Sequence, residues 1–195
     1  MGGNVLDVGG KKTGQRGEFR PPMGQVTSWK YVNIDASTLP DFCCSAENIP
    51  SADGSIDTVL LCEVLEHLED PEKVLQECQR VLRPGGNLIA SMPFLFPVHA
   101  DPHDFQRWTG VKLAKVMEGI GYGDVEIQTM GGIGSVVHDL LFVASSRAHG
   151  RYIRKFAETS LSVAKPLLRH LDAKSETIHA SVTTGYFILA RKQRN

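Results

Sequence analysis

The sequence predicts a doubly wound α/β domain, in which strand-like and helix-like segments alternate along 195 residues. Three observations lead to this fold class. Several apolar runs show little polar alternation, as strands of a parallel sheet do when helices cover both faces. Segments with helical periodicity lie between these runs, and the first run leads directly into the pair Gly9-Gly10. We therefore expect a ligand site at the carboxyl ends of the strands, where the strand order reverses.

Each expected element has its own local signals. Asp70 can cap a helix over 70–86, Pro71 suits its first turn, and Pro84-Gly85-Gly86 is expected to stop it. A second helix of the same kind is expected over 109–122. The strands predicted from runs of Val, Ile and Leu are 5–8, 29–35, 57–63, 86–93, 124–130 and 181–192.

Residues 133–180 interrupt this alternation. Apolar residues recur there near helical spacing, with arginines and lysines between them. We predict an amphipathic helical insertion before the last strand, bent at Pro166. The whole chain, residues 1–195, is expected to be a single domain in which 133–180 forms a helical lid.

Composition bounds the class of protein. The chain is 42% hydrophobic and 22% charged, as one globular domain with a sizeable core would be. Its four cysteines show no CxxC spacing, and the two in apolar runs, Cys62 and Cys78, are expected to be buried, reduced thiols. Neither a secretory signal nor an apolar run of membrane-spanning length is present, so we expect a cytoplasmic protein.

The net charge of −1 conceals an asymmetry. From Arg147 onward the chain has ten basic and three acidic residues, a balance of +7, which leaves −8 for the rest. A basic amphipathic segment indicates peripheral contact with an anionic membrane or a phosphate-linked glycan precursor. The alternatives are a solvated basic face and a helix pair that covers the substrate or forms a homodimer. Nucleic acid is not an expected partner, because the chain as a whole is not strongly basic.

The turn after the first strand is a candidate nucleotide site. Gly9 and Gly10 allow a ligand to approach the backbone, and Asp35, at the end of the second strand, can accept hydrogen bonds from both ribose hydroxyls. A nicotinamide-dependent oxidoreductase would need a full GxGxxG turn, which residues 9–14 do not supply.

The block from residue 45 to 93, "SAENIPSADGSIDTVLLCEVLEHLEDPEKVLQECQRVLRPGGNLIASMP", resembles the class I S-adenosylmethionine-dependent methyltransferases of the type 11 kind. The resemblance is carried by Ser45-Ala46-Glu47, Ile56-Asp57, the segment from Glu63 to Leu68, and the segment from Arg80 to Gly86, and it extends from about Val5 to Tyr122. It implies a Rossmann-like, mostly parallel sheet of seven strands with an antiparallel last strand, and S-adenosylmethionine as cofactor.

The resemblance also implies a set of cofactor-binding residues. The family usually has a further glycine where Lys11 stands, and we predict that Lys11 or Lys12 pairs with the cofactor carboxylate or an anionic substrate; the alternative is that both point to solvent. Core packing remains an alternative for Cys62, and a helix-start role for Glu47. The full predicted set is Asp7, Gly9, Gly10, Lys11, Asp35, Ala46, Glu47, Cys62 and Glu63, with no metal. Glu66 and His67 are typical of the family, and His67 is interpreted as a packing or helix-start residue rather than a base.

The segment "PFLFPVHADPHDFQRWT", residues 93–109, contains the predicted catalytic residues. Its pattern HxDPxDFxRWT resembles that of methyltransferases associated with bacterial cell-surface polysaccharide pathways. Histidine suits a base near neutral pH, so His99 is the first candidate and His103 the second. Asp104 could orient a histidine and Arg107 could bind an anionic group. The alternative is an Asp104–Arg107 ion pair, with Phe105 and Trp108 filling the core.

These features predict transfer of a methyl group to a small-molecule or glycan acceptor, through a hydroxyl. The alternative is a catalytically silent S-adenosylmethionine-binding protein of the same fold. No segment precedes the first predicted strand, whereas the family usually has a helix there that covers the cofactor. Either the gene start is misplaced, or residues 19–29 cover that side instead.

Overall fold

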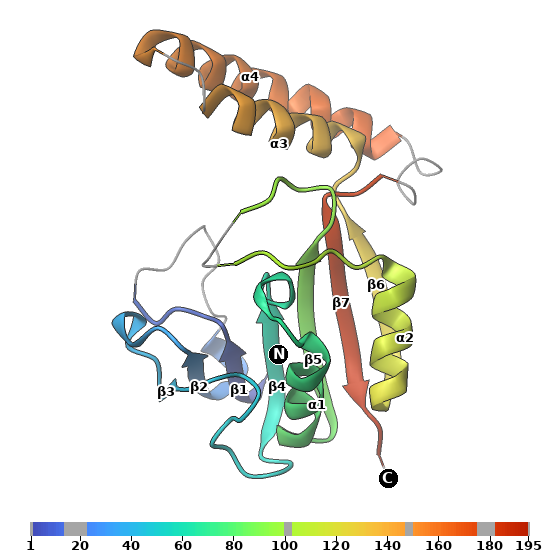
Figure 1. Cartoon of the computed structure of the whole chain (residues 1–195). Coiled ribbons are helices and arrows are strands. Elements are labelled where there is room, and N and C mark those ends of the chain that lie inside the picture. The colour runs from blue at the N-terminus through green and yellow to red at the C-terminus, as the bar shows by residue number, and fades with distance from the viewer. Residues whose placement is uncertain (1, 14–22, 100–102, 147–149, 175–181, 195) are drawn as a thin grey trace. The chain divides into compact units, whose positions relative to one another are not determined.

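The computed structural model describes residues 2–13, 23–99, 103–146, 150–174 and 182–194 (Figure 1). Its contacts define two compact units. Unit 1 comprises Met1–Met92, Phe105–Ile127 and Phe187–Asn195. Unit 2 comprises Pro93–Asp104 and Gln128–Tyr186. Each unit is described by itself.

A seven-stranded sheet of order β3-β2-β1-β4-β5-β7-β6 forms the centre of unit 1, and this confirms the predicted fold class. The pairs β2–β3, β1–β2, β1–β4 and β4–β5 are parallel, and Figure 1 shows β7 running antiparallel to its neighbours. The strands are β1 (Gly3–Val8), β2 (Val26–Asn33), β3 (Phe42–Cys43), β4 (Ile56–Cys62), β5 (Leu82–Pro93), β6 (Tyr122–Met130) and β7 (Gly185–Lys192). Because β1 pairs with both β2 and β4, the strand order reverses beside β1.

The buried pattern of the strands follows their sequence. In β4 the side chains of Val59, Leu60 and Leu61 are all buried, as expected of a strand covered on both faces. The strand β2 begins at Val26 and ends at Asn33, so Asp35 lies beyond the strand instead of ending it. Part of the stretch 19–29 that was expected to cover the cofactor side, residues 19–22, lies outside the described residues.

The first predicted helix forms, but it is shorter than expected. The helix α1 spans Pro71–Val81, with the Asp70 side chain accepting a hydrogen bond from the Lys73 N–H and Pro71 in the first turn. The prediction that it continues to the Pro84-Gly85-Gly86 stop was wrong. Leu82 is already extended and pairs with Ile56, because its buried side chain belongs to the sheet. The register then shifts, and residues 83–86 form an irregularity in β5.

The second helix, α2 (Gly110–Ile120), agrees closely with its prediction. Thr109 caps its first turn, and Gly121, with φ +100°, ends it in the left-handed conformation that glycine adopts without strain. α1 and α2 contact each other beside the sheet (Figure 1). The Tyr122 hydroxyl, which is buried, donates a hydrogen bond to the Leu75 carbonyl and so joins the start of β6 to α1.

Unit 2 contains two helices within the predicted insertion, α3 (Ile133–Ser146) and α4 (Arg151–Lys174). They contact each other closely, and α4 continues through Pro166. Residues 147–149 and 175–181 of the predicted insertion and last strand lie outside the described part of the chain. Among the described residues, no helix combines the length and apolar character needed to cross a bilayer.

The expectation that the cysteines in apolar runs are buried holds for one of the two. Cys78 is fully buried in α1, whereas Cys62 is exposed. Cys62 is the last residue of β4, so its side chain has reached the end of the covered sheet. All four cysteines are free thiols.

Candidate functional site

The turn after β1 follows a backbone path that only glycine fits. Gly9 has φ +82°, and its N–H donates to the Val32 carbonyl at 2.8 Å. A Cβ atom at Gly9 would collide with the side chain of Val64, and one at Gly10 would collide with the carboxylate of Asp7. The protein's own side chains, rather than a ligand alone, therefore require both glycines.

Asn33, the last residue of β2, fixes this turn. Its side-chain amide donates to the carbonyls of Gly9 and Gly10, each at 3.1 Å, and its Oδ1 atom accepts from the Asp35 N–H at 2.9 Å. One side chain thus ties the glycine turn to the residue expected to bind ribose. Sequence reasoning missed Asn33, although a polar residue between the apolar strand and Asp35 was a visible signal.

Asp35 is exposed and ionised. Its Oδ1 atom accepts a hydrogen bond from the Ser37 N–H at 2.9 Å and caps the short helix η2 (Ala36–Thr38). Hydrogen bonds from Ser37 lower the pKa of Asp35, and the charge of Lys11 lowers it further. The carboxylate is therefore a preorganised hydrogen-bond acceptor at the end of β2.

The two lysines of the turn have different surroundings. Lys12 Nζ lies 3.0 Å from Asp41 Oδ1, while the other Asp41 oxygen accepts from the Tyr31 N–H at 2.9 Å. Lys11 lies near enough to Asp35 to affect its pKa. Lys12 is thus paired with Asp41, and the charge of Lys11 acts on Asp35, the ribose candidate.

Asp7 lies beneath the glycine turn. Desolvation raises its pKa to about 6, although a hydrogen bond from the Trp29 side chain acts in the opposite direction. Burial penalises the negative charge, so a cation beside Asp7 would favour its ionised form. Such a carboxyl group suits a ligand that carries positive charge.

Glu63 follows β4 in a strained conformation. Its φ is +54°, which a non-glycine residue adopts only at a cost of order 1 kcal/mol. Ser91 of β5 holds it there: the Glu63 N–H donates to the Ser91 carbonyl and hydroxyl at 3.2 and 3.1 Å, and the hydroxyl donates to Glu63 Oε1 at 2.7 Å. The backbone therefore presents the Glu63 carboxylate at the carboxyl end of the sheet in a fixed orientation.

Cys62 precedes Glu63 and faces an acidic environment. Cys62 as a whole residue is exposed to solvent. The surrounding protein atoms nevertheless desolvate its thiol, which raises the thiol pKa, and the negative charges of Asp7 and Glu63 raise it as well. Together they raise the pKa of Cys62 to about 11. The raised pKa disfavours the thiolate, the nucleophilic form, so the neutral thiol is suited to line a site.

Ala46 and Glu47 lie in a turn after β3. The Glu47 N–H donates to the Ser45 hydroxyl at 3.2 Å, and the Asn48 N–H donates to the Ser45 carbonyl at 3.2 Å. Ala46 is half-buried and Glu47 is exposed. Glu47 does not begin a helix, so that alternative for it was wrong: the Ser45 side chain closes a turn here instead.

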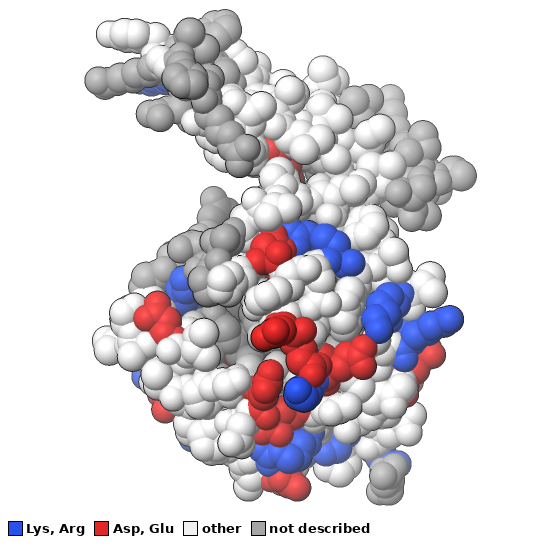
Figure 2. Space-filling model, viewed as in Figure 1, with Lys and Arg blue, Asp and Glu red and all other residues white. Residues whose placement is uncertain are grey.

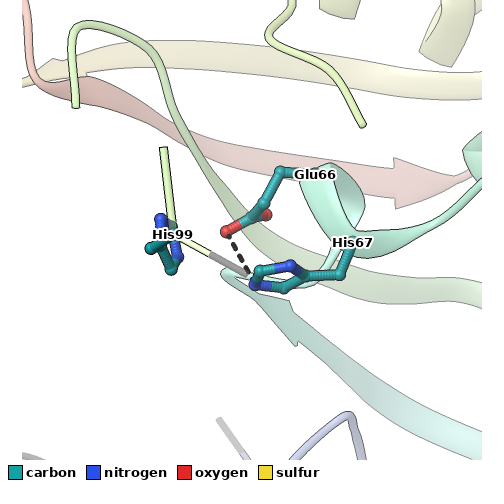
Figure 3. Close-up of side chains that lie close together, drawn as sticks. All are labelled: Glu66, His67 and His99. Atoms are coloured by element: carbon teal, nitrogen blue, oxygen red, sulfur yellow. Dashed lines mark ion pairs between the residues drawn. The ribbon is translucent and has the colours of Figure 1, made fainter. Parts of the chain in front are cut away.

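The side chains of Glu66 and His67 lie beside each other in the short helix η3 (Leu65–His67) that follows β4, as Figure 3 shows. His67 Nε2 lies 3.5 Å from Glu66 Oε1, and the Glu66 side chain is completely buried. Burial raises the pKa of Glu66 to about 7. The charge of Glu63 also raises this pKa, whereas the charges of His67 and Arg107 lower it. The sequence indicated Glu66 only as a family-typical residue; its position between Leu65 and Leu68 was the available signal of burial.

The segment just before α2 is hydrogen-bonded to η3. The Phe105 N–H donates to the Glu66 carbonyl, and Gln106 Nε2 donates to the Leu68 carbonyl, each at 2.8 Å. Trp108 Nε1 donates to Gln106 Oε1 at 2.8 Å and is nearly buried, whereas Phe105 is half exposed. These bonds place Arg107 within electrostatic range of Glu66.

The other three predicted catalytic residues belong to unit 2. The His99 N–H donates to Asp104 Oδ2 at 3.0 Å, and the same oxygen lies 3.7 Å from His99 Nδ1. The His99 ring packs edge-on against Phe96 and is partly exposed, whereas the Asp104 side chain is almost buried. Asp104 thus holds the backbone of His99, whose Nδ1 atom also lies 3.3 Å from the Pro97 carbonyl oxygen, and His103 is exposed.

The site in unit 1 combines a glycine turn, an exposed carboxylate after β2, a desolvated acid in β1 (Asp7) and another after β4 (Glu66). Figure 2 shows that acidic side chains also gather on the surface over η3 and α1, with basic side chains beside them, and ion pairs such as Lys73–Asp70 and Lys112–Glu72 occur there. This chemistry suits a ligand that carries ribose hydroxyls and a cationic group.

Comparison with known proteins shows which families part of this chain resembles. The model of the family described as "Methyltransferase domain" matches residues 19–90. A ubiquinone biosynthesis O-methyltransferase from Cupriavidus pinatubonensis is 47% identical over 38 residues, which are 20% of this chain and 15% of that protein. A probable S-adenosylmethionine-dependent methyltransferase from Mycolicibacterium smegmatis is 47% identical over 45 residues, 23% of this chain and 18% of that protein.

Solved structures agree over nearly the whole chain. Phosphoethanolamine N-methyltransferase 2 from Haemonchus contortus, determined with S-adenosylhomocysteine, superposes with a TM-score of 0.59 at 16% identity, covering 99% of this chain and 50% of that one. The alignments with the first curated relatives span less than a fifth of the length of those proteins. The matched domain and these relatives make part of this chain similar to S-adenosylmethionine-dependent methyltransferases. The chain has the fold of solved S-adenosylmethionine-dependent methyltransferases, and its residues 19–90 match the methyltransferase domain model.

Proposed function

We propose that the chain transfers a methyl group from S-adenosylmethionine to a hydroxyl of a small molecule or glycan. The observation that carries the proposal is the position of Asp7, a desolvated carboxyl beneath the Gly9-Gly10 turn at the point where the strand order reverses. A buried acid in this place favours a cationic ligand. Because residues 19–90 match a methyltransferase domain, we infer that this cationic ligand is a cofactor with a sulfonium group.

The residues present fit this cofactor. Asp35 would accept hydrogen bonds from the ribose hydroxyls, and Asp7 and Glu63 would offset the positive charges of the methionine part. Lys11 would pair with the methionine carboxylate, while Ala46, Glu47 and Cys62 would line the remaining surface. When bound, S-adenosylmethionine supplies a methyl group activated by the sulfonium charge.

The chain's own task is then to align the acceptor and to take its proton. We propose His99 as the proton acceptor, because Asp104 holds its backbone N–H and lies beside its Nδ1 atom. His103 is the second candidate. Arg107 would bind an anionic group of the acceptor, and a carboxylate or phosphate suits its planar guanidinium.

Calorimetric titration tests the cofactor. S-Adenosylmethionine and S-adenosylhomocysteine are expected to bind with micromolar affinity, and NAD, as a control, is expected not to bind. Asp35→Ala should weaken binding about tenfold, since a charge-assisted hydrogen bond contributes ~1.5 kcal/mol or more. Asp124→Ala, which removes a similarly exposed carboxylate from the start of β6, is the matched control. Equal loss in both variants, or no binding by the unchanged chain, would contradict the proposal.

Methyl transfer is tested separately, by release of S-adenosylhomocysteine in the presence of sugars, glycan fragments and phenols as acceptors. Release with a hydroxyl acceptor that is abolished in His99→Ala supports the assignment. Cofactor binding without release for any acceptor would favour the silent binding protein instead. A His99→Ala variant with unchanged turnover would remove His99 from the mechanism.

A further inference from the structure

The two helices of the α3–α4 hairpin in unit 2 pack tightly against each other. A Cβ atom at Gly134 would collide with the carbonyl oxygen of Leu168, so the two helix backbones approach as closely as glycine allows. Asp172 of α4 caps the start of α3: it accepts from the Gly134 N–H at 2.7 Å, the Ser135 N–H at 3.1 Å and the Ser135 hydroxyl at 2.6 Å. The two helices are therefore held in one arrangement.

Each helix of this hairpin exposes a row of apolar side chains. On α3 the exposed residues Ile133, Val137, Leu140 and Leu141 follow one another at intervals of four, three and one, which places them along one face. On α4 Tyr152, Val163 and Leu167 are 87%, 76% and 66% exposed. Their spacings of eleven and four residues again correspond to one face. Several exposed apolar side chains on one face of an ordered helix indicate an interaction surface, in contrast to single apolar side chains scattered over a protein surface.

The charge of α4 indicates what this surface meets. Between Arg151 and Lys174 the helix has six basic residues and two acids, in a chain whose net charge is −1. One of the two acids, Asp172, is occupied in capping α3. An apolar row on a basic helix, with a tyrosine near its beginning, is the composition of helices that lie in the interface of an anionic bilayer.

A second copy of the chain fits this surface less well. Symmetric pairing through α4 would bring two strongly basic helices together, and like charges repel. An anionic lipid surface instead attracts lysine and arginine side chains near it. No described helix is suited to cross a bilayer, so contact would be at the membrane surface.

We propose that the α3–α4 hairpin docks on an anionic lipid bilayer, with its exposed apolar side chains inserted below the headgroups and the exposed Lys155 of α4 among the headgroups. This interaction does not depend on the proposed methyl transfer. It would place the enzyme where membrane-linked acceptors occur.

Co-sedimentation of the full chain with vesicles tests the proposal. Binding is expected to be at least about tenfold stronger to vesicles containing phosphatidylglycerol than to pure phosphatidylcholine, and to weaken with added salt. The double variant Val163→Ser/Leu167→Ser and the variant Lys155→Glu should each lower binding severalfold. Their matched controls lie on α2: Val111→Ser removes an apolar side chain that is 68% exposed, and Lys115→Glu reverses an exposed charge.

Every outcome of these binding measurements either supports or overturns the proposed membrane docking. Thermal unfolding identifies variants that have lost their fold, and those are replaced by Leu140→Ser/Leu141→Ser in the other row. Equal binding to neutral and anionic vesicles would overturn the proposal, as would equal effects of the hairpin variants and the α2 controls. So would a dimer in light scattering that the hairpin variants dissociate while vesicle binding is absent.

Discussion

The carboxylate of Asp7 lies directly against the Cα atom of Gly10, so that any side chain at residue 10 would overlap it. Asp7 lies in β1 between the buried residues Leu6 and Val8, and Gly10 belongs to the turn expected to approach the cofactor. The same contact desolvates the acid, whose pKa burial raises to about 6. Turn geometry and acid chemistry at this site are therefore coupled.

Gly10→Ala should consequently impair both stability and cofactor affinity. Overlap with the Asp7 carboxylate is expected to cost about 1–3 kcal/mol of unfolding free energy and to lower affinity for S-adenosylmethionine at least about tenfold. Gly119→Ala is the control, because no atom lies within 4 Å of a Cβ built there and the site is within α2. It should raise stability by about 0.5–1 kcal/mol. Urea unfolding and calorimetry measure both effects, and an unaffected Gly10→Ala protein would contradict the contact.

The two lysines of the turn should differ in their effect on cofactor affinity. Lys12 is engaged by Asp41, so Lys12→Ala is expected to leave affinity for S-adenosylmethionine unchanged. Lys11→Ala should weaken it about two- to fivefold, the contribution of one partly exposed ion pair. Calorimetry on both variants distinguishes them. The reverse order of effects would show that Lys12 leaves Asp41 when the cofactor binds.

Glu66 should make the protein less stable as pH rises. In the unfolded chain its proton is lost near the ordinary pKa of 4.5, whereas in the folded chain burial raises the pKa to about 7. Between these values the folded state binds more protons, so the free energy of unfolding falls as pH increases. Asp7 acts in the same direction between 3.8 and about 6.

Glu66→Gln keeps the shape of the protonated acid and removes this ionisation. The variant should be as stable as the parent below about pH 4.5 and more stable above pH 7, by up to roughly 3 kcal/mol. Urea unfolding across this window measures the slope, with Glu118→Gln, an exposed acid of α2, as control. An unchanged slope in Glu66→Gln would show that the buried group does not titrate as expected.

Asp172 should control the first turn of α3 from the end of α4. Asp172→Ala removes three hydrogen bonds at a helix N-terminus and is expected to lower hairpin stability by about 1–2 kcal/mol. Hydrogen exchange of the Gly134 and Ser135 amides should accelerate accordingly. Asp139→Ala, which removes an acid of α3 that pairs with His138, should leave these amides protected.

Local sequence signals predicted much of the fold. The capping residues Asp70 and Thr109 begin helices where expected, because a cap acts within four residues of its own position. The end of α1 was not predictable in this way. Leu82 leaves the helix because it pairs with Ile56, a partner far away in the sequence.

The candidate site likewise has features that local sequence signals indicate and features that depend on tertiary contacts. The sequence by itself indicated Gly9, Gly10 and Asp35 as candidates, because glycine conformation and the position of an acid after a strand are local properties. Only the tertiary structure showed that Asn33 joins them, that Ser91 holds Glu63, and that Lys12 belongs to Asp41. The acidity of Asp7 and Glu66 was likewise decided by packing, since desolvation depends on which segments cover a carboxyl group, and those segments are distant in sequence.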